Sequence, residues 1–122
     1  MVENRTTDGT RLAELLSSEI HGRDAGPLGR LAVTDADREV EPRADGAYAF
    51  TVARGDEPIA TAHVHPDRLH LEIAGEPERA AERATELELR VRPKAVEPPR
   101  TLVFVEDGAA VKRATDLLTA LA

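Results

Sequence analysis

Residues 47–74 carry an alternation of apolar and polar side chains that is typical of β-strands with one buried face. The alternation runs through three successive stretches. Two short polar segments, 55–57 and 65–68, separate them and have the composition of tight turns. The sequence therefore predicts a three-stranded antiparallel meander.

The register of this meander follows from the residues that must share a face. Pairing Val52 with Ala60 and Val64 with Leu69 closes two hairpins, whereas a slip of one residue would move apolar side chains to the polar face. The residues expected on the buried face are Tyr48, Phe50, Val52, Ala60, Ala62, Val64, Leu69, Leu71 and Ile73.

Three helices are expected around these strands, at residues 8–22, 76–87 and 107–121, where apolar residues recur at helical spacing. Two more strands are expected at residues 89–92 and 101–105. The order α-β-β-β-α-β-β-α predicts an α+β two-layer sandwich, in which three helices cover an antiparallel or mixed sheet of about five strands. The 122 residues suit a single domain.

One apolar patch before the meander is ambiguous. Leu28, Leu31 and Val33 fit either one helical turn or a short strand.

The last expected strand carries apolar residues on both faces. Leu102 and Phe104 alternate with Val103 and Val105, so one layer of helices can cover only one of the two pairs. We expect this strand either to be central in the sheet or to meet a second subunit. Val103 and Val105 are the candidate interface residues of a homodimer.

Histidines gather on the polar face of the meander. In the register above, His63 and His65 point away from the core, His70 lies directly across from His63, and Glu72 is diagonal to it. Imidazole nitrogens and a carboxylate are donors for a zinc-like ion, so these four residues form a candidate divalent-metal site, hydrolytic if the ion activated a water. The plainer interpretation is a wetted sheet face with polar side chains.

The net charge changes sign along the chain: −4 over residues 1–50, −5 over residues 51–88 and +2 over residues 89–122. Arg90, Arg92, Lys94 and Arg100 concentrate the positive charge and could bind an oxyanion or a nucleic-acid backbone. We prefer the interpretation that they pair with neighbouring carboxylates, as Arg90 and Arg92 could with Glu72. Nucleic acid is not expected, because no aromatic side chain lies among these residues and the whole chain is negative.

Several kinds of active site lack their residues. The chain has no cysteine, and its two serines lie inside the first expected helix without a nucleophile-elbow pattern. We assign no catalytic residue and expect a non-catalytic interaction or binding module, with two alternatives: the metal-dependent site, or an anion or RNA-backbone contact through the basic strand and loop. No apolar run approaches the ~20 residues of a membrane span, which predicts a cytoplasmic protein.

The composition favours a salt-adapted organism. Fourteen arginines stand against two lysines, and the net charge is −7. Such an acidic surface repels itself in dilute buffer, but at molar ionic strength the Debye length falls to about 3 Å and the repulsion is screened.

The segment from Leu89 to Lys112, LRVRPKAVEPPRTLVFVEDGAAVK, resembles an uncharacterised family of small haloarchaeal proteins, and HVHPDR at 63–68 is similar more weakly. The resemblance spans residue 7 to the C-terminus. It implies a halophilic archaeal cytosol, and it brings no activity, substrate or functional residue to this chain.

Overall fold

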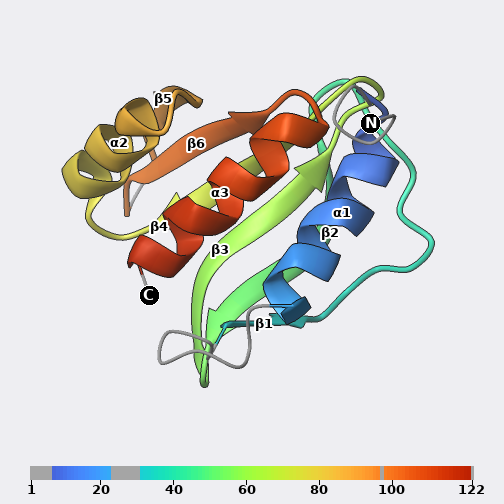
Figure 1. Ribbon diagram of the computed structural model, residues 1–122, viewed down its shortest axis with the longest axis horizontal. Coiled ribbons are helices and arrows are strands. Elements are labelled where there is room, and N and C mark those ends of the chain that lie inside the picture. The colour runs from blue at the N-terminus through green and yellow to red at the C-terminus, as the bar shows by residue number, and fades with distance from the viewer. Residues whose placement is uncertain (1–6, 23–30, 97, 122) are drawn as a thin grey trace.

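Three helices lie on one face of a six-stranded antiparallel sheet in the computed structural model, which describes residues 7–22, 31–96 and 98–121 (Figure 1). The strand order is β1-β2-β3-β4-β6-β5. The elements are α1 (Gly9–Gly22), β1 (Leu31–Thr34), β2 (Ala47–Arg54), β3 (Glu57–Val64), β4 (Leu69–Ala74), α2 (Pro77–Glu86), β5 (Arg90–Lys94), β6 (Arg100–Val105) and α3 (Gly108–Leu121).

The expected α+β architecture is confirmed, with one strand more than predicted. The ambiguous patch forms β1, an edge strand in which Leu31 lies opposite Arg54 of β2. Four strands therefore precede α2, and the sheet has six strands instead of five. Leu28 lies outside the described residues.

Both predicted hairpin registers are confirmed: Val52 lies opposite Ala60, and Val64 lies opposite Leu69. Eight of the nine residues expected on the buried face are buried in the core. The ninth, Tyr48, is a wrong prediction. The register shifts at a bulge between Tyr48 and Phe50, so Tyr48 lies on the outer face opposite His63, with 38% of its surface exposed.

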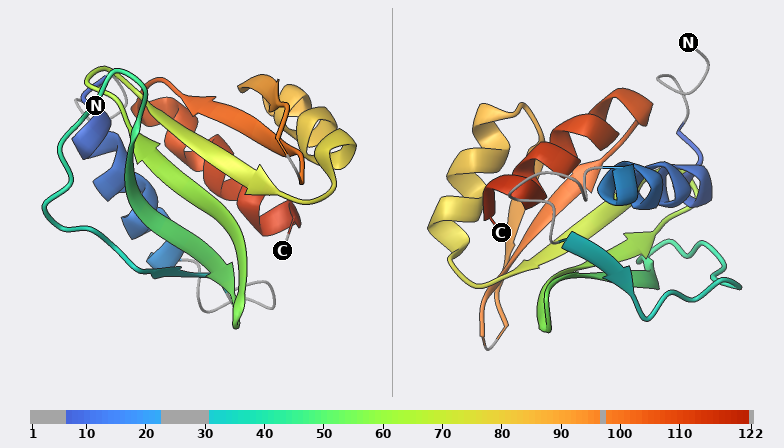
Figure 2. Two further views of the ribbon diagram at one scale, coloured as in Figure 1. Left: turned by 180° about the vertical axis from the view of Figure 1, so that it is seen from behind. Right: turned by 60° about the horizontal axis from the view of Figure 1, so that its bottom comes forward.

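The helices begin at Gly9, Pro77 and Gly108, each one residue inside its predicted range. The N–H of Arg11 donates to Asp8 Oδ1 at 3.0 Å, and the N–H of Ala110 donates to Asp107 Oδ1 at 2.9 Å. Pro77 opens α2, where its missing N–H leaves no hydrogen bond unmade. Seen from behind, the outer face of the sheet carries none of the three described helices (Figure 2).

Strand β6 lies between β4 and β5, with its Val103 and Val105 fully buried in the core of the same chain. This placement corrects their choice as interface residues, because a partner could reach only the other face of the strand. That face carries Leu102 and Phe104, both half-buried.

Candidate metal centre

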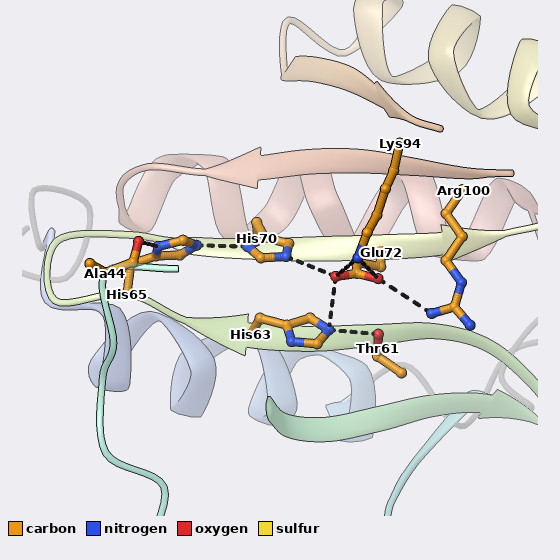
Figure 3. Close-up of polar contacts among 8 residues, drawn as sticks. All are labelled: Ala44, Thr61, His63, His65, His70, Glu72, Lys94 and Arg100. Atoms are coloured by element: carbon orange, nitrogen blue, oxygen red, sulfur yellow. Dashed lines mark hydrogen bonds and ion pairs between the residues drawn. The ribbon is translucent and has the colours of Figure 1, made fainter. Parts of the chain in front are cut away.

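Strands β3 and β4 place His63, His70 and Glu72, three side chains that could hold a metal ion, together on the outer face of the sheet (Figure 3). Buried apolar residues alternate with His63 in β3 and with His70 and Glu72 in β4. His63 lies directly opposite His70, as the sequence predicted. The hairpin register alone therefore brings the three side chains to one place.

The loop before β2 covers this cluster. His65, which follows β3, is only 4% exposed, and its ring centre lies 4.9 Å from that of His70. The backbone at Gly46 passes over the rings with φ +91, and a Cβ there would lie 2.8 Å from His70 Cε1 and 3.1 Å from His65 Nε2. The N–H of Arg43 donates to the carbonyl of Val64 at 3.2 Å and ties this loop to β3.

A chain of polar contacts runs from the loop to Glu72 and fixes the proton positions. His65 Nδ1 lies 2.9 Å from the carbonyl oxygen of Ala44, which can only accept, so Nδ1 carries the hydrogen. His65 Nε2 is then the acceptor in a neutral ring, and His70 Nδ1, 2.7 Å away, must donate to it. Neutral His70 is left with a bare lone pair on Nε2, 3.3 Å from Glu72 Oε2.

Two acceptors that face each other repel, so the contact between His70 Nε2 and Glu72 Oε2 calls for one added positive charge, either a proton or a metal ion. A proton shared by His65 and His70 would satisfy it, and so would a metal ion at His70 Nε2. With the metal, His65 becomes the outer hydrogen-bond partner that orients a metal-ligating histidine.

The three donor atoms lie within 4.8 Å of one another, and the two distances from Glu72 match the spacing around a tetrahedral ion. Glu72 Oε2 lies 3.3 Å from His70 Nε2 and 3.5 Å from His63 Nε2. Metal–ligand bonds of about 2.0–2.1 Å at tetrahedral angles separate two ligand atoms by about 3.3–3.4 Å. The His63 and His70 rings are stacked within 9° of parallel, so an ion in the plane of both requires the more exposed ring, His63, to tilt.

Of the four predicted ligands, the structure thus brings His63, His70 and Glu72 together. His65 is adjacent but supports His70 instead of joining the donor set.

Glu72 is held by two cations from the neighbouring strands. Lys94 Nζ on β5 lies 3.2 Å from both carboxylate oxygens, and Arg100 Nη1 on β6 lies 3.3 Å from Oε1. These contacts keep the carboxylate in one orientation beside the two imidazoles.

The protonation states suit metal binding. Burial lowers the pKa of His63, and it lowers the pKa of His70 to about 4 although Glu72, which would accept a hydrogen bond from the protonated ring, opposes it. Burial alone would raise the pKa of Glu72, but the hydrogen bond and positive charge of Lys94 and the facing imidazoles outweigh it and hold that pKa below its usual value. At neutral pH His63 and His70 are neutral and Glu72 is ionised, which are the forms that ligate.

The family of unknown function DUF7993 matches residues 1–122. The chain belongs to this family. No curated protein and no solved structure matches the DUF7993 chain. None of the helices in the described ranges is long and apolar enough to cross a membrane.

The four basic residues of this DUF7993 chain divide between two places. Lys94 and Arg100 pair with Glu72, whereas Arg90 pairs with Glu106 at 2.9 Å. Arg92 is exposed and makes no ion pair within the described part of the chain. Three of the four basic residues thus pair with neighbouring carboxylates, but the expected pairs of Arg90 and Arg92 with Glu72 are not the ones that form.

A nucleophile triad is not built here. Thr61 Oγ1 lies 2.8 Å from His63 Nε2, the same nitrogen that faces Glu72. In a triad the histidine bridges the nucleophile and the acid through its two different nitrogens. The shared nitrogen rules out that role for Thr61.

Sequence reasoning missed the Glu72 partners and the loop contacts at Ala44 and Gly46. Lys94 and Arg100 reach Glu72 because β6 inserts between β4 and β5, and strand order carries no local signal. The presence of a glycine at position 46 could have indicated this contact, because glycine allows the backbone to approach side chains closely.

Proposed function

We propose that this protein is a binding module that holds one divalent transition-metal ion, of the zinc class, through His63, His70 and Glu72. The observation that carries the proposal is the 3.3 Å contact of Glu72 Oε2 with His70 Nε2, the nitrogen that has no hydrogen when both rings of the Ala44–His65–His70 chain are neutral. A metal ion between them turns a repulsive contact into two coordination bonds and leaves every hydrogen bond from Ala44 to His70 intact.

The chemistry of the donors supports a zinc-class ion. Two imidazoles and one carboxylate are borderline ligands that suit Zn²⁺, Co²⁺ or Ni²⁺ better than Mg²⁺ or Ca²⁺, which prefer oxygen. Three protein donors leave a coordination position for water or another small ligand.

We infer binding, not hydrolysis, as the role of the site. Among the described residues of the cluster, each imidazole and the carboxylate already serves as a ligand or as the support of one. A hydrolytic mechanism would need a further acid or base at the reacting water.

Metal content tests the proposal. Protein stripped of metal in molar KCl, loaded with Zn²⁺ or Co²⁺ and freed of excess ion, should retain one ion per chain by elemental analysis. His63→Ala should lose it, and His65→Ala should bind about 10–100-fold more weakly because His70 loses its support. The matched control is His21→Ala, an exposed position on α1 away from the site.

Either of two results would contradict the metal site. Either wild-type protein retains no ion, or His63→Ala retains as much as His21→Ala while circular dichroism shows both folded.

We further propose that the protein works in the cytosol of a salt-adapted archaeon. The excess of acidic residues, the preference for arginine over lysine and the resemblance of residues 89–112 to haloarchaeal proteins support this setting.

A further inference from the structure

The metal centre lies in a locally positive environment on a negative protein. Glu72 supplies one negative charge, and two cations, Lys94 and Arg100, already contact it. A divalent ion would add two more positive charges at the same carboxylate. Uncompensated charge of one sign is costly where water has little access, so the loaded site calls for an anion.

The two cations stand where an anion can reach them. The side chains of Lys94 and Arg100 are 41% and 42% exposed, whereas the Glu72 side chain between them is 9% exposed. Their charged ends therefore lie at the mouth of the site and the carboxylate lies deeper. Arg92 lies opposite Leu102, two residues before Lys94 on β5, and adds a third cation that has no ion pair in the described ranges.

We propose that the ion bound by His63, His70 and Glu72 takes a phosphoryl oxyanion, inorganic phosphate or a phosphate monoester, as its exogenous ligand, with Lys94 and Arg100 pairing to the remaining oxygens. This inference rests on the proposed metal site. A phosphoryl group carries up to two negative charges and three or more acceptor oxygens, so it can meet the ion and both cations at once.

Direct coordination also suits a cytosol of high ionic strength. Binding through screened charges and counterion release is weak at molar salt. A bond from a phosphate oxygen to the metal is not screened, so the ion would provide the affinity while Lys94 and Arg100 would select for charge and shape.

Calorimetric titration of the Zn²⁺-loaded protein, freed of excess ion, in molar KCl tests the inference. The probes are inorganic phosphate and phenyl phosphate, with acetate as the control for a singly charged, two-oxygen anion. We expect phosphate to bind to loaded protein, and binding to loaded Lys94→Gln to be about tenfold weaker. The matched control is Lys112→Gln, which removes the only other lysine, an exposed residue on α3, and should leave phosphate affinity unchanged.

Thermodynamic linkage provides a second readout. If the ion and phosphate share the site, phosphate must raise the affinity for Zn²⁺ by the same factor by which Zn²⁺ raises the affinity for phosphate. Binding of both probes would place a monoester in the site, whereas binding of inorganic phosphate alone would restrict the ligand to the free anion.

Different results would contradict the oxyanion ligand and the metal site. Zn²⁺ retention without phosphate binding, or equal phosphate binding to Lys94→Gln and Lys112→Gln, overturns the oxyanion ligand and leaves the metal site standing. Phosphate binding that is equal with and without Zn²⁺ overturns the metal-bound ligand. Failure to retain Zn²⁺ overturns both proposals.

Discussion

At the scale of single residues, Gly46 is where the loop and the site depend on each other most closely. Alanine there would combine a positive φ of +91 with a Cβ 2.8 Å from His70 Cε1. We expect Gly46→Ala to lower the free energy of unfolding by about 1–3 kcal/mol and to weaken metal binding. Urea denaturation in molar KCl and a Zn²⁺ titration measure the two effects.

The control for Gly46 is another glycine with positive φ. Gly55 has φ +60, but a Cβ there meets nothing within 4 Å. Gly55→Ala therefore carries backbone strain without a clash, and it should leave metal affinity unchanged. Equal effects of the two substitutions on stability and on metal affinity would contradict the role of the loop.

His70 links the stability of the metal-free protein to pH. Burial lowers its pKa from 6.5 to about 4, so between these values the unfolded chain binds a proton that the folded chain does not. The contribution of His70 to the free energy of unfolding is therefore fully present above the pKa of the unfolded chain, and it is lost as the pH falls from that pKa towards the pKa of the folded protein. His63 and Glu72, whose pKa values are also lowered, act in the same direction.

The measurement is urea denaturation with a chelator present, from about pH 7 to about pH 5. We expect the free energy of unfolding to decrease over this range, and to decrease less in His70→Asn. The same decrease in both proteins would show that another group governs the pH dependence.

Residue-level prediction from the sequence succeeded where alternation was unbroken and failed at the bulge. His63, His70 and Glu72 were placed correctly because each lies between two buried neighbours in a regular strand. Tyr48 was misplaced because one extra residue in β2 reverses the face of everything before it. Alternation in sequence contains no marker of such an insertion.

At the scale of elements, the hairpins and helix caps were predictable and the strand order was not. Turns and caps are encoded within a few residues, as at Asp8, Pro77 and Asp107. The insertion of β6 beside β4 depends on packing across the whole sheet. The contacts of Lys94 and Arg100 with Glu72 follow from that insertion, which is why only half of the site could be predicted.

Self-association through the outer face of β6 stays a prediction. Phe104 on that face is covered in part by the guanidinium groups of Arg68 and Arg90, 5.9 and 5.8 Å from its ring centre, which leaves half-buried Leu102 as the apolar side chain open to a partner. We expect a homodimer in molar KCl by analytical ultracentrifugation, weakened in Leu102→Ser.

The control for this prediction is Val96→Ser, which removes an exposed apolar side chain, 40% accessible, from the loop after β5. A sedimented mass of 13.2 kDa for the wild-type chain would contradict the dimer.

At the scale of the whole molecule, the net charge of −7 makes stability depend on salt. Exposed glutamates in α2 illustrate the repulsion: Glu78 and Glu82 lie one helical turn apart. We expect the free energy of unfolding to rise from about 0.1 M to about 2 M KCl. The double variant Glu78→Gln, Glu82→Gln should rise less, and a stability independent of KCl would contradict the adaptation to salt.

The three proposed metal ligands all belong to one hairpin, within ten consecutive residues of the chain. Closing so short a loop costs little chain entropy, and a turn of this size forms in microseconds. An ion could therefore bind as soon as β3 and β4 meet, before β6 and the C-terminal helix arrive. In that case the metal would accelerate folding itself, acting as the nucleus on which the rest of the sheet assembles.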